Sequence, residues 1–320
     1  MRALADGPDC WHNESMQLAI ITQRATETNL ALAAAAPRGV RFCLFSPEQA
    51  VAQLGHGDAA LGRLDVLPTL DGVEDGLWAL GSLAAGGIRT LNRAGALLAA
   101  HDKLLTARLL LRAGLPHPRT RLLSPGGPLP ELRLPVVVKP RFGSWGTDVV
   151  RCADQAALRS HVRELELRPW YRAHGALVQE LVPPQGADLR IVVAGGVVIG
   201  AIERVAAKGE WRTNVALGAK RRPVEPPSFA CMLALEAAAA AGGDLIGVDL
   251  LPDGEGGWTV LELNGAVEWT REYSLDRDPF VAAAWELARV ALGCPLGPAG
   301  PGKVVPRPLR LAETPATLPA

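Results

Sequence analysis

The chain has 320 residues, 48% of them hydrophobic and 21% charged, which is ordinary for a globular protein of two or three subdomains. Lysine and arginine together number 33, as do aspartate and glutamate, so the formal net charge is zero. This balance gives no electrostatic reason to expect nucleic acid or an anionic membrane as a partner. Residues 1–15 contain no apolar leader, and no apolar run reaches about 18 residues, so we expect a cytoplasmic protein without a membrane span.

The first part of the chain predicts a parallel α/β layer. Short apolar segments alternate with helical ones, a pattern typical of parallel strands that are connected by helices. We expect strands at 18–22, 40–45, 63–67 and 88–91, and helices at 31–36 and 76–85. These elements form an α/β domain over residues 16–94, preceded by an N-terminal extension over residues 1–15.

The rest of the chain predicts an α+β arrangement. An amphipathic helix at 95–113 is closed by Gly114, with Pro116 just beyond. Segments rich in β-branched residues then predict strands at 135–139, 149–151, 177–182, 190–193, 197–204, 246–251 and 258–264, and helices at 155–167, 228–241 and 280–292. We divide this part into a central subdomain, a C-terminal subdomain and a disordered Pro- and Gly-rich tail, at 95–182, 183–296 and 297–320.

The last predicted hairpin, GVDLL followed by TVLELNG, carries the sharpest chemical pattern. Glu262 and Asn264 lie two positions apart on one strand, so their side chains face the same side. Reflection of the chain about the turn places Asp249 opposite Leu261 or Glu262. Unpaired carboxylates in apolar strands are costly, and a hard cation such as Mg²⁺ offsets that cost. The pattern predicts a magnesium site of three oxygen ligands, with a solvated acidic edge hairpin as the alternative.

A second pattern, VVVKPRFGSWGTDVV, indicates a loop that binds phosphate. A strand delivers Lys139, and Gly143 and Gly146 in the following loop let backbone N–H groups approach phosphate oxygens closely. The segment is neither a Walker A loop nor a G-x-G-x-x-G loop. The alternative is a plain hairpin turn with a snorkelling lysine. Lys103, on the preceding amphipathic helix, is by itself a surface lysine.

Two weaker patterns lie between these motifs. The strand end formed by Glu180, Leu181 and Val182 could offer backbone groups to an adenine edge, and Asp188 could hold ribose hydroxyls. A solvated strand end explains the same residues. Arg212, in the segment EWRTN, could stabilise charge on a transferring phosphoryl group, or it could belong to an exposed polar loop.

Together and in this order, the segments resemble the ATP-grasp superfamily. They resemble most the RimK-like α-L-glutamate ligases, which include ribosomal-protein ligases and amino-group-carrier-protein ligases. The matching segments are HDKLLTARLLLRAGLPHPRT, PVVVKPRFGSWG, QELV with GADLRIVV, ERVAAKGEWRTN, GVDLL and VLELN. The GSWG loop is similar to that of the carrier-protein ligases. In ribosomal-protein ligases the metal-binding Asn typically precedes a small residue, Ser, Pro and Gly, whereas Asn264 precedes GAVEW.

The resemblance implies an ATP-grasp fold: an α/β pre-domain followed by two α+β subdomains that hold ATP between antiparallel sheets. It implies contacts to the ATP phosphates by Lys103 and Lys139, a loop closing over them at Gly143, Ser144 and Gly146, adenine binding by Glu180, Leu181 and Val182, and ribose binding by Asp188. It implies γ-phosphate contacts by Arg212 and Asn214, metal ligation by Asp249, Glu262 and Asn264, and contacts to the acyl phosphate and an amino-acid carboxylate by Arg190 and Arg204.

The implied activity is ATP-dependent carboxylate–amine ligation through an acyl phosphate. The implied cofactors are ATP and Mg²⁺, with Mn²⁺ as an alternative metal. The implied partners are a glutamate-like amino acid and a carboxylate acceptor, which is a small molecule or a protein terminus or side chain. Ligases of this kind are often homo-oligomers. Two alternatives stay open: an ATP-grasp phosphotransferase that stops at a phosphorylated product, and a nucleotide-binding protein without catalysis.

Overall fold

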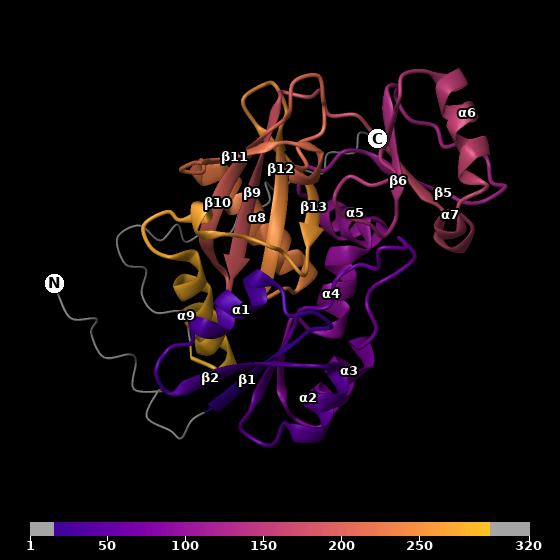
Figure 1. Ribbon diagram of the computed structural model, residues 1–320. Helices are drawn as coiled ribbons and strands as arrows, with labels where there is room; N and C mark the ends of the chain where they lie inside the picture. Colours follow the sequence, from indigo (N-terminus) through magenta and orange to yellow (C-terminus); the bar gives the residue numbers. More distant parts are fainter. Residues whose placement is uncertain (1–15, 295–320) are drawn as a thin grey trace, which may run out of the picture.

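Three β-sheets organise the computed structural model, which describes residues 16–294 (Figure 1). The N-terminal extension and the C-terminal tail expected from the sequence lie outside these residues. The first sheet is parallel in the order β2-β1-β3-β4, which confirms the predicted α/β layer. Its strands are β1 Met16–Ile21, β2 Val40–Phe45, β3 Ala59–Gly62 and β4 Arg89–Leu91, and its connections contain α1 Glu27–Ala34, α2 Pro47–Gln53 and α3 Leu77–Ala85.

Two antiparallel sheets follow. A four-stranded sheet has the order β5-β8-β6-β7, and helices α6 and α7 belong to the same segment of the chain. Its elements are β5 Thr120–Leu123, β6 Val136–Pro140, β7 Val150–Cys152, α6 Gln155–Leu165, α7 Pro169–His174 and β8 Ala176–Glu180. Figure 1 shows this unit projecting to one side of the molecule.

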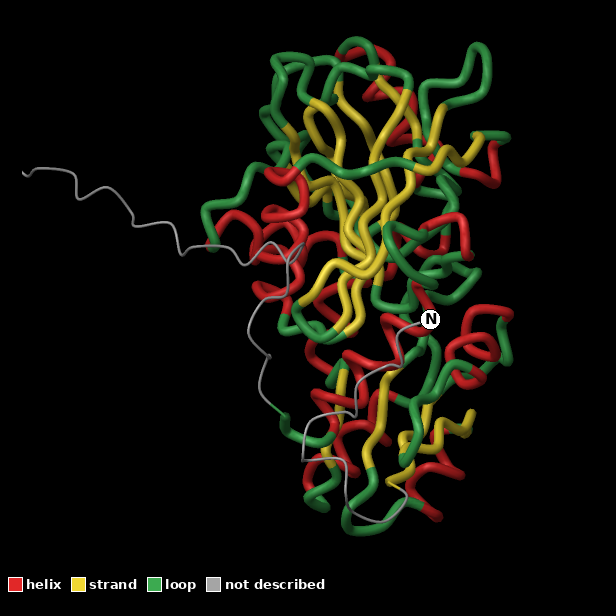
Figure 2. The backbone as a smooth tube through the Cα atoms, turned by 90° about the vertical axis from the view of Figure 1, so that its left-hand side faces the viewer, coloured by secondary structure: helices red, strands yellow, loops and turns green. Residues whose placement is uncertain are grey.

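A five-stranded sheet of order β11-β10-β9-β12-β13 completes the framework, with α8 packed on it. Its strands are β9 Ala187–Ala194, β10 Val197–Val205, β11 Lys220–Pro223, β12 Leu245–Pro252 and β13 Trp258–Asn264, and α8 spans Ser228–Ala241. Short helices η2 Val215–Leu217 and η3 Arg271–Tyr273 and the final helix α9 Pro279–Ala291 complete the described chain. Seen from the side, the strands of this sheet stand above the smaller parallel layer (Figure 2).

Two predicted elements were wrong in position. The long helix expected at 95–113 is two helices, α4 Ala94–His101 and α5 Lys103–Arg112, because Asp102 leaves helical geometry to cap α5. Its carboxylate accepts the backbone N–H groups of Leu104 and Leu105. The third strand is β3, four residues earlier than expected. Its small residues are fully buried, whereas Val66, inside the predicted strand, forms only an isolated bridge.

Two α-helices and two strands were not predicted, α2, α7, β5 and β11, nor were the short helices η2 and η3. Helix α2 begins at a capping box in which Ser46 and Gln49 bond reciprocally to backbone N–H groups, a local signal that the apolar pattern does not contain. The sequence of β11 is KRRP, and all four residues are exposed, so hydrophobic periodicity cannot predict this strand.

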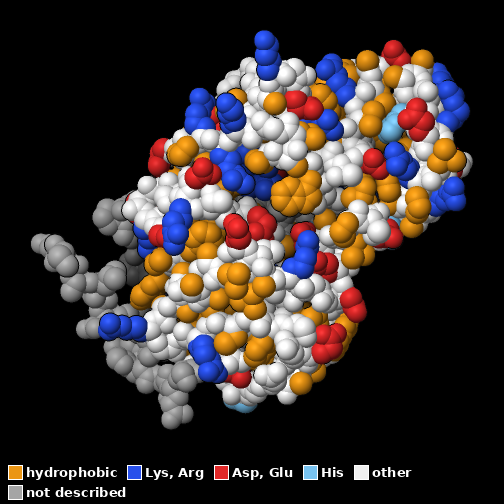
Figure 3. Space-filling view, viewed as in Figure 1, with side chains coloured by type: hydrophobic (Ala, Val, Ile, Leu, Met, Phe, Trp, Pro, Cys, Tyr) orange, Lys and Arg blue, Asp and Glu red, His pale blue; other side chains and the backbone are white. Residues whose placement is uncertain are grey.

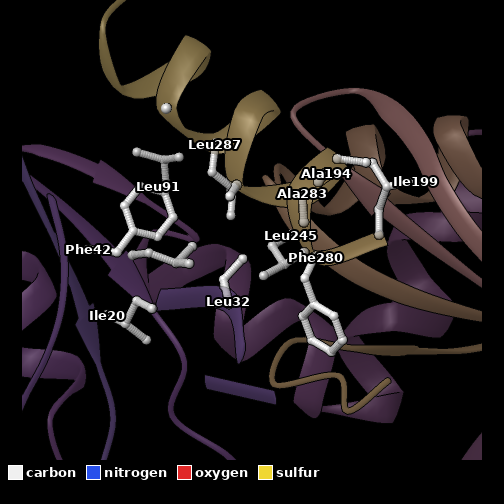
Figure 4. Packing of buried hydrophobic residues seen from close by; sticks show 14 of the residues in the cluster. Ile20, Leu32, Phe42, Leu91, Ala194, Ile199, Leu245, Phe280, Ala283 and Leu287 are labelled. Atoms are coloured by element: carbon white, nitrogen blue, oxygen red, sulfur yellow. The ribbon is translucent and has the colours of Figure 1, made fainter. Parts of the chain in front are cut away.

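The largest hydrophobic core joins the parallel layer to the five-stranded sheet. Figure 4 shows Leu287 of α9 close to Leu91 of β4, and Ala283 of the same helix close to Ala194 of β9. Helix α9 therefore packs against both parts, and a buried surface shared in this way fixes their relative position. None of the helices in residues 16–294 has the length and apolar character needed to cross a bilayer.

Candidate active site

The main cavity lies between the four-stranded and the five-stranded antiparallel sheets. It encloses about 900 Å³ including its open mouth, which is within the size range of small-molecule sites. The wall is built from β6, the loop at 143–147, the end of β8, strands β9, β10, β12 and β13, and the segment 211–214. On this face of the molecule, side chains of both charges gather around a hydrophobic patch (Figure 3). Most of the predicted residues thus come together in this cavity from separate parts of the chain, and the other two, Arg190 and Asn264, line the adjoining cavity.

Lys139 points from β6 into this cavity although its side chain is almost fully buried. Its Nζ donates to Oε1 of Gln179 at 2.9 Å, and the amide of Gln179 in turn donates to Thr120 at 2.8 Å. Burial lowers the pKa of Lys139 to about 8, against the opposite influence of the Glu262 carboxylate. A buried cation without a hydrogen-bonded acid partner is costly, so this lysine is suited to receive an anion.

Lys103 begins α5 and reaches the same place. Its Nζ donates to the carbonyl oxygen of Gly143 and lies 3.7 Å from Oε2 of Glu262. The helix that carries it is positioned by Asp102, which forms a paired hydrogen bond with Arg141 at 2.8 and 2.6 Å. The structure places Lys103 in the cavity wall, which corrects its interpretation as a surface lysine. The phosphate contact that the resemblance implies stays a prediction.

The glycine loop covers one side of the cavity. Gly146 has a positive φ of 75°, and a Cβ at this position would meet the side-chain oxygen of Asn214 at 2.7 Å, so a larger residue would be strained and would displace Asn214. Arg212 donates to the carbonyl oxygens of Gly146 and Val149, both at 3.3 Å, and pairs with Glu210. The loop and the segment 210–214 are therefore held against each other across the cavity mouth.

A network of two arginines and two aspartates forms the floor of the cavity. Asp249 on β12 lies opposite Arg190 on β9 in the strand register, and the two side chains make a paired contact with both distances 2.6 Å. Arg204 on β10 donates to Asp249 at 2.9 Å as well as to Asp188. Burial opposes ionisation of Asp249, but Arg190 and Arg204 outweigh it and hold its pKa well below the usual range.

Asp188 lines the cavity, and its carboxylate is paired with an arginine. Both of its oxygens accept hydrogen bonds from Arg204, which lies opposite it in the register of β9 and β10, and the side chain is 1% exposed. Burial raises the pKa of Asp188 despite the neighbouring guanidinium. The geometry suits Asp188 to orienting Arg204, and the ribose contact implied by the resemblance stays a prediction.

The three predicted metal ligands lie on neighbouring strands of the β12–β13 hairpin, and their joint binding of a cation stays a prediction. Asp249 pairs in register with Glu262, one of the two partners that reflection about the turn allowed, and a bulge follows immediately. The side-chain Nδ2 of Asn264 is buried without a hydrogen-bond partner among the described residues. Within residues 16–294 no three His, Cys, Asp or Glu side chains are placed to hold a metal ion, so a cation here would combine the two carboxylates with the amide oxygen and oxygens of a bound ligand.

The strand end at 180–182 lies in the cavity wall, opposite the charged floor. Glu180 accepts the backbone N–H of Arg133 at 3.1 Å with its side chain, which holds this carboxylate at the edge of the sheet. The backbone N–H of Leu181 donates to Pro135 at 3.1 Å. Leu181 and Val182 thus present apolar side chains and backbone to the cavity, an environment suited to an aromatic base.

A second cavity adjoins the first one. Five residues line both: Ser144, Trp145, Arg204, Asn214 and Glu262. The second cavity also contains side chains that the sequence patterns did not single out: Asp65, Arg221, Glu268 and Tyr273. Sequence reasoning also missed Gln179, whose only signal is its position on the strand beside the residues proposed for adenine.

Comparison with known proteins then decides the family. Residues 100–283, more than half of the chain, match the RimK-like ATP-grasp domain. The chain belongs to the RimK-like ATP-grasp family. This confirms the family and the fold class that the sequence motifs indicated, and the residues of both antiparallel sheets lie inside the matched segment.

Relatives in this family are named as ligases. The chain is 34% identical over 185 residues to the alpha-aminoadipate–LysW ligase LysX of Sulfurisphaera tokodaii, covering 57% of this chain and 65% of that protein. It is 34% identical over 220 residues to a probable alpha-L-glutamate ligase of Serratia proteamaculans, covering 67% and 70%. The ATP-grasp fold is shared with a RimK domain protein of Sphaerobacter thermophilus, with a TM-score of 0.61 at 23% identity over 85% of this chain and 99% of that one.

Proposed function

We propose that this chain is an ATP-dependent carboxylate–amine ligase that forms an amide bond through an acyl phosphate. The observation that carries the proposal is the convergence of Lys103, Lys139 and the acid pair Asp249 and Glu262 on one cavity between two antiparallel sheets. The names of the relatives support the same reaction class. A reaction that consumes ATP belongs in the cytoplasm, where ATP is available.

The nucleotide lies in the main cavity in this proposal. The two lysines and the backbone of the loop at 143–146 bind the phosphates, and Arg212 and Asn214 contact the γ-phosphate from the other side of the mouth. Glu180, Leu181 and Val182 hold adenine. Because Lys139 is buried, its charge acts in a medium of low effective dielectric, where it interacts with a phosphate more strongly than in water.

The cation expected with the nucleotide is Mg²⁺, held by Asp249, Glu262 and Asn264. The donor set fits, because two carboxylates and the side-chain oxygen of an amide are the hard oxygen donors that Mg²⁺ prefers. Both oxygens of Asp249 also accept hydrogen bonds from arginines, so in this proposal its lone pairs are divided between the arginines and the cation. When bound, the cation neutralises charge on the phosphates; Mn²⁺ is tested as a substitute.

The carboxylate to be activated lies at the boundary of the two cavities. Arg204 lines both of them, and Arg190 lines the second, so each can contact a developing acyl phosphate. Their guanidinium groups are already fixed by Asp249 and Asp188, which lowers the cost of orienting them during the reaction. Water would hydrolyse the intermediate, and Trp145, 57% exposed beside the loop glycines, is placed to exclude it when the loop closes.

A panel of amine and carboxylate pairs would identify the substrates. The names of relatives suggest L-glutamate or α-aminoadipate as the amine and a LysW-type carrier protein as the carboxylate. Purified protein would be incubated with ATP, Mg²⁺ and each pair, and release of ADP and the mass of the product would be measured. An amide with stoichiometric ADP supports the proposal. ADP with a stable phosphorylated substrate, or no turnover with any pair, contradicts it.

A further inference from the structure

Two acids of the second cavity, Asp65 and Glu268, are associated with the parallel layer, whereas its three arginines come from the five-stranded sheet. Asp65 follows β3 of the parallel layer, and Glu268 is bonded to residues of that same layer. The arginines of this cavity, Arg190, Arg204 and Arg221, come from β9, β10 and β11 of the five-stranded sheet. A cavity with this polarity is complementary to a molecule that carries an ammonium at one end and a carboxylate at the other.

Glu268 is the acid whose geometry is best defined. Its Oε1 accepts from Nη2 of Arg63 at 3.1 Å and from the hydroxyl of Thr26 at 3.0 Å. Its Oε2 accepts no hydrogen bond from the described residues, and the side chain is 35% exposed. One oxygen is therefore fixed by the protein and the other is available to a ligand in the cavity.

Arg63 fixes the position of the Glu268 carboxylate. Its side chain is 1% exposed, and besides Glu268 it donates to Oδ1 of Asn29 at 2.9 Å and to the carbonyl of Val267 at 2.8 Å. Burial lowers the pKa of Arg63, against the influence of Glu268. Burying such a pair is often no more stable than apolar packing. Stabilisation alone therefore does not explain the buried Arg63–Glu268 pair, and its geometry favours a role in positioning Glu268.

We propose that Glu268 receives the ammonium group of the amine substrate and accepts its proton, with Arg63 as the positioning residue. The proposal rests on the ligase function. One proton passes from the ammonium to Oε2 of Glu268, and the freed nitrogen lone pair attacks the acyl carbon. The C–N bond forms and the C–O bond to the phosphoryl group breaks. The nitrogen loses its second proton to the departing phosphate, which leaves as hydrogen phosphate, and the amide is complete.

The other acids of the cavity are less suited to this role. Glu262 lies beside Lys103 and belongs to the set proposed for the cation. Asp65 accepts the backbone N–H of Val66 with one oxygen and Arg24 with the other, at 2.7 and 3.4 Å. Glu268 alone among these three has a fully anchored oxygen and an unoccupied one.

The test separates amide formation from activation of the carboxylate. Glu268→Gln keeps the side-chain shape and removes the base. Wild type and variant would be assayed with ATP, Mg²⁺ and a LysW-type carrier, first with L-glutamate or α-aminoadipate as the amine and then with hydroxylamine. Hydroxylamine is uncharged at neutral pH, so it reacts with the acyl phosphate without a base. We expect kcat with the amino acid to fall about 100-fold or more, while hydroxamate formation stays within about twofold.

Two further variants complete the test. Arg63→Lys should lower kcat for amide formation roughly 10-fold or more, because lysine cannot reproduce three hydrogen bonds in different directions, and should leave hydroxamate formation unchanged. Asp276→Asn removes an acid that is 83% exposed on the same connecting segment and lies outside the cavity wall, and should change neither reaction.

Equal loss of both reactions in Glu268→Gln, or undiminished amide formation, would overturn the inference. If the wild type forms no hydroxamate with any carboxylate, the ligase function itself fails, and the inference fails with it. These outcomes differ in the wild-type measurement, so the two failures are distinguishable.

Discussion

Replacing Lys139 by methionine should separate stability from function. The pKa of Lys139 is lowered from 10.5 to about 8, so keeping this lysine charged in the folded protein costs about 3 kcal/mol. Methionine removes that cost, but it leaves Oε1 of Gln179 without its donor, a loss of about 1–3 kcal/mol. We expect Lys139→Met to be as stable as the wild type or more stable by about 1 kcal/mol, and to bind ATP roughly 10- to 100-fold more weakly.

The pH dependence of stability and of ATP affinity provides a second, independent test of this prediction. Because the folded-state pKa lies below the unfolded value, the unfolded wild type binds more protons between about pH 8 and 10.5, and its stability rises with pH over that window. The free energy of unfolding of the wild type should therefore rise relative to that of Lys139→Met between pH 8 and 10.5. ATP affinity of the wild type should fall as pH rises through about 8, because the neutral amine attracts phosphate less.

Urea denaturation at several pH values and calorimetric titration with ATP and Mg²⁺ measure both effects. Lys208→Met, at an exposed lysine outside both cavities, is the matched control and should show neither. The reasoning is refuted if Lys139→Met is destabilised by more than about 1 kcal/mol, or if it releases ADP at the wild-type rate.

Three further variants probe other parts of the site. Glu262→Gln should raise the Mg²⁺ concentration required for ATP binding about 10-fold or more, and calorimetry that shows an unchanged Mg²⁺ requirement would contradict the metal site. Gly146→Ala should raise the KM for ATP by pushing Asn214 aside, whereas Gly114→Ala, with a similar positive φ but open space around it, should not. Asp188→Asn should lower stability by about 3 kcal/mol in urea denaturation, because it removes a buried carboxylate from its arginine; a stability equal to wild type would show that the pair contributes little.

The metal hairpin was the most predictable part of the site because local rules decide its geometry. The two-residue period of a strand places Glu262 and Asn264 on one side, and the short turn restricts the partner of Asp249 to two positions. The bulge after Asp249 selects between them, and the sequence carries no signal for it. The arginine partners of Asp249 depend on which strands lie beside β12, and the order of strands in a sheet is not a local property.

Charged residues in buried positions account for most of what the sequence did not predict. Arg63 and Asp102 are charged residues of a kind usually found at the surface. Arg63 is nevertheless buried. Asp102 caps α5 at a point where hydrophobic periodicity predicts one continuous helix. Their burial follows from specific partners far along the chain: Glu268 for the first and Arg141 for the second. A single sequence contains no rule that pairs residues over such separations.

The core shared between α9 and the parallel layer limits how this protein can be recombined. The segment that carries the family match, 100–283, ends within α9 and lacks β1 to β4, so in isolation it would expose core residues such as Leu245 and Phe280 to water. Grafting this half onto a foreign N-terminal layer would require matched side chains along the whole contact. Chimeras joined only by a linker near residue 94 should accumulate as insoluble protein.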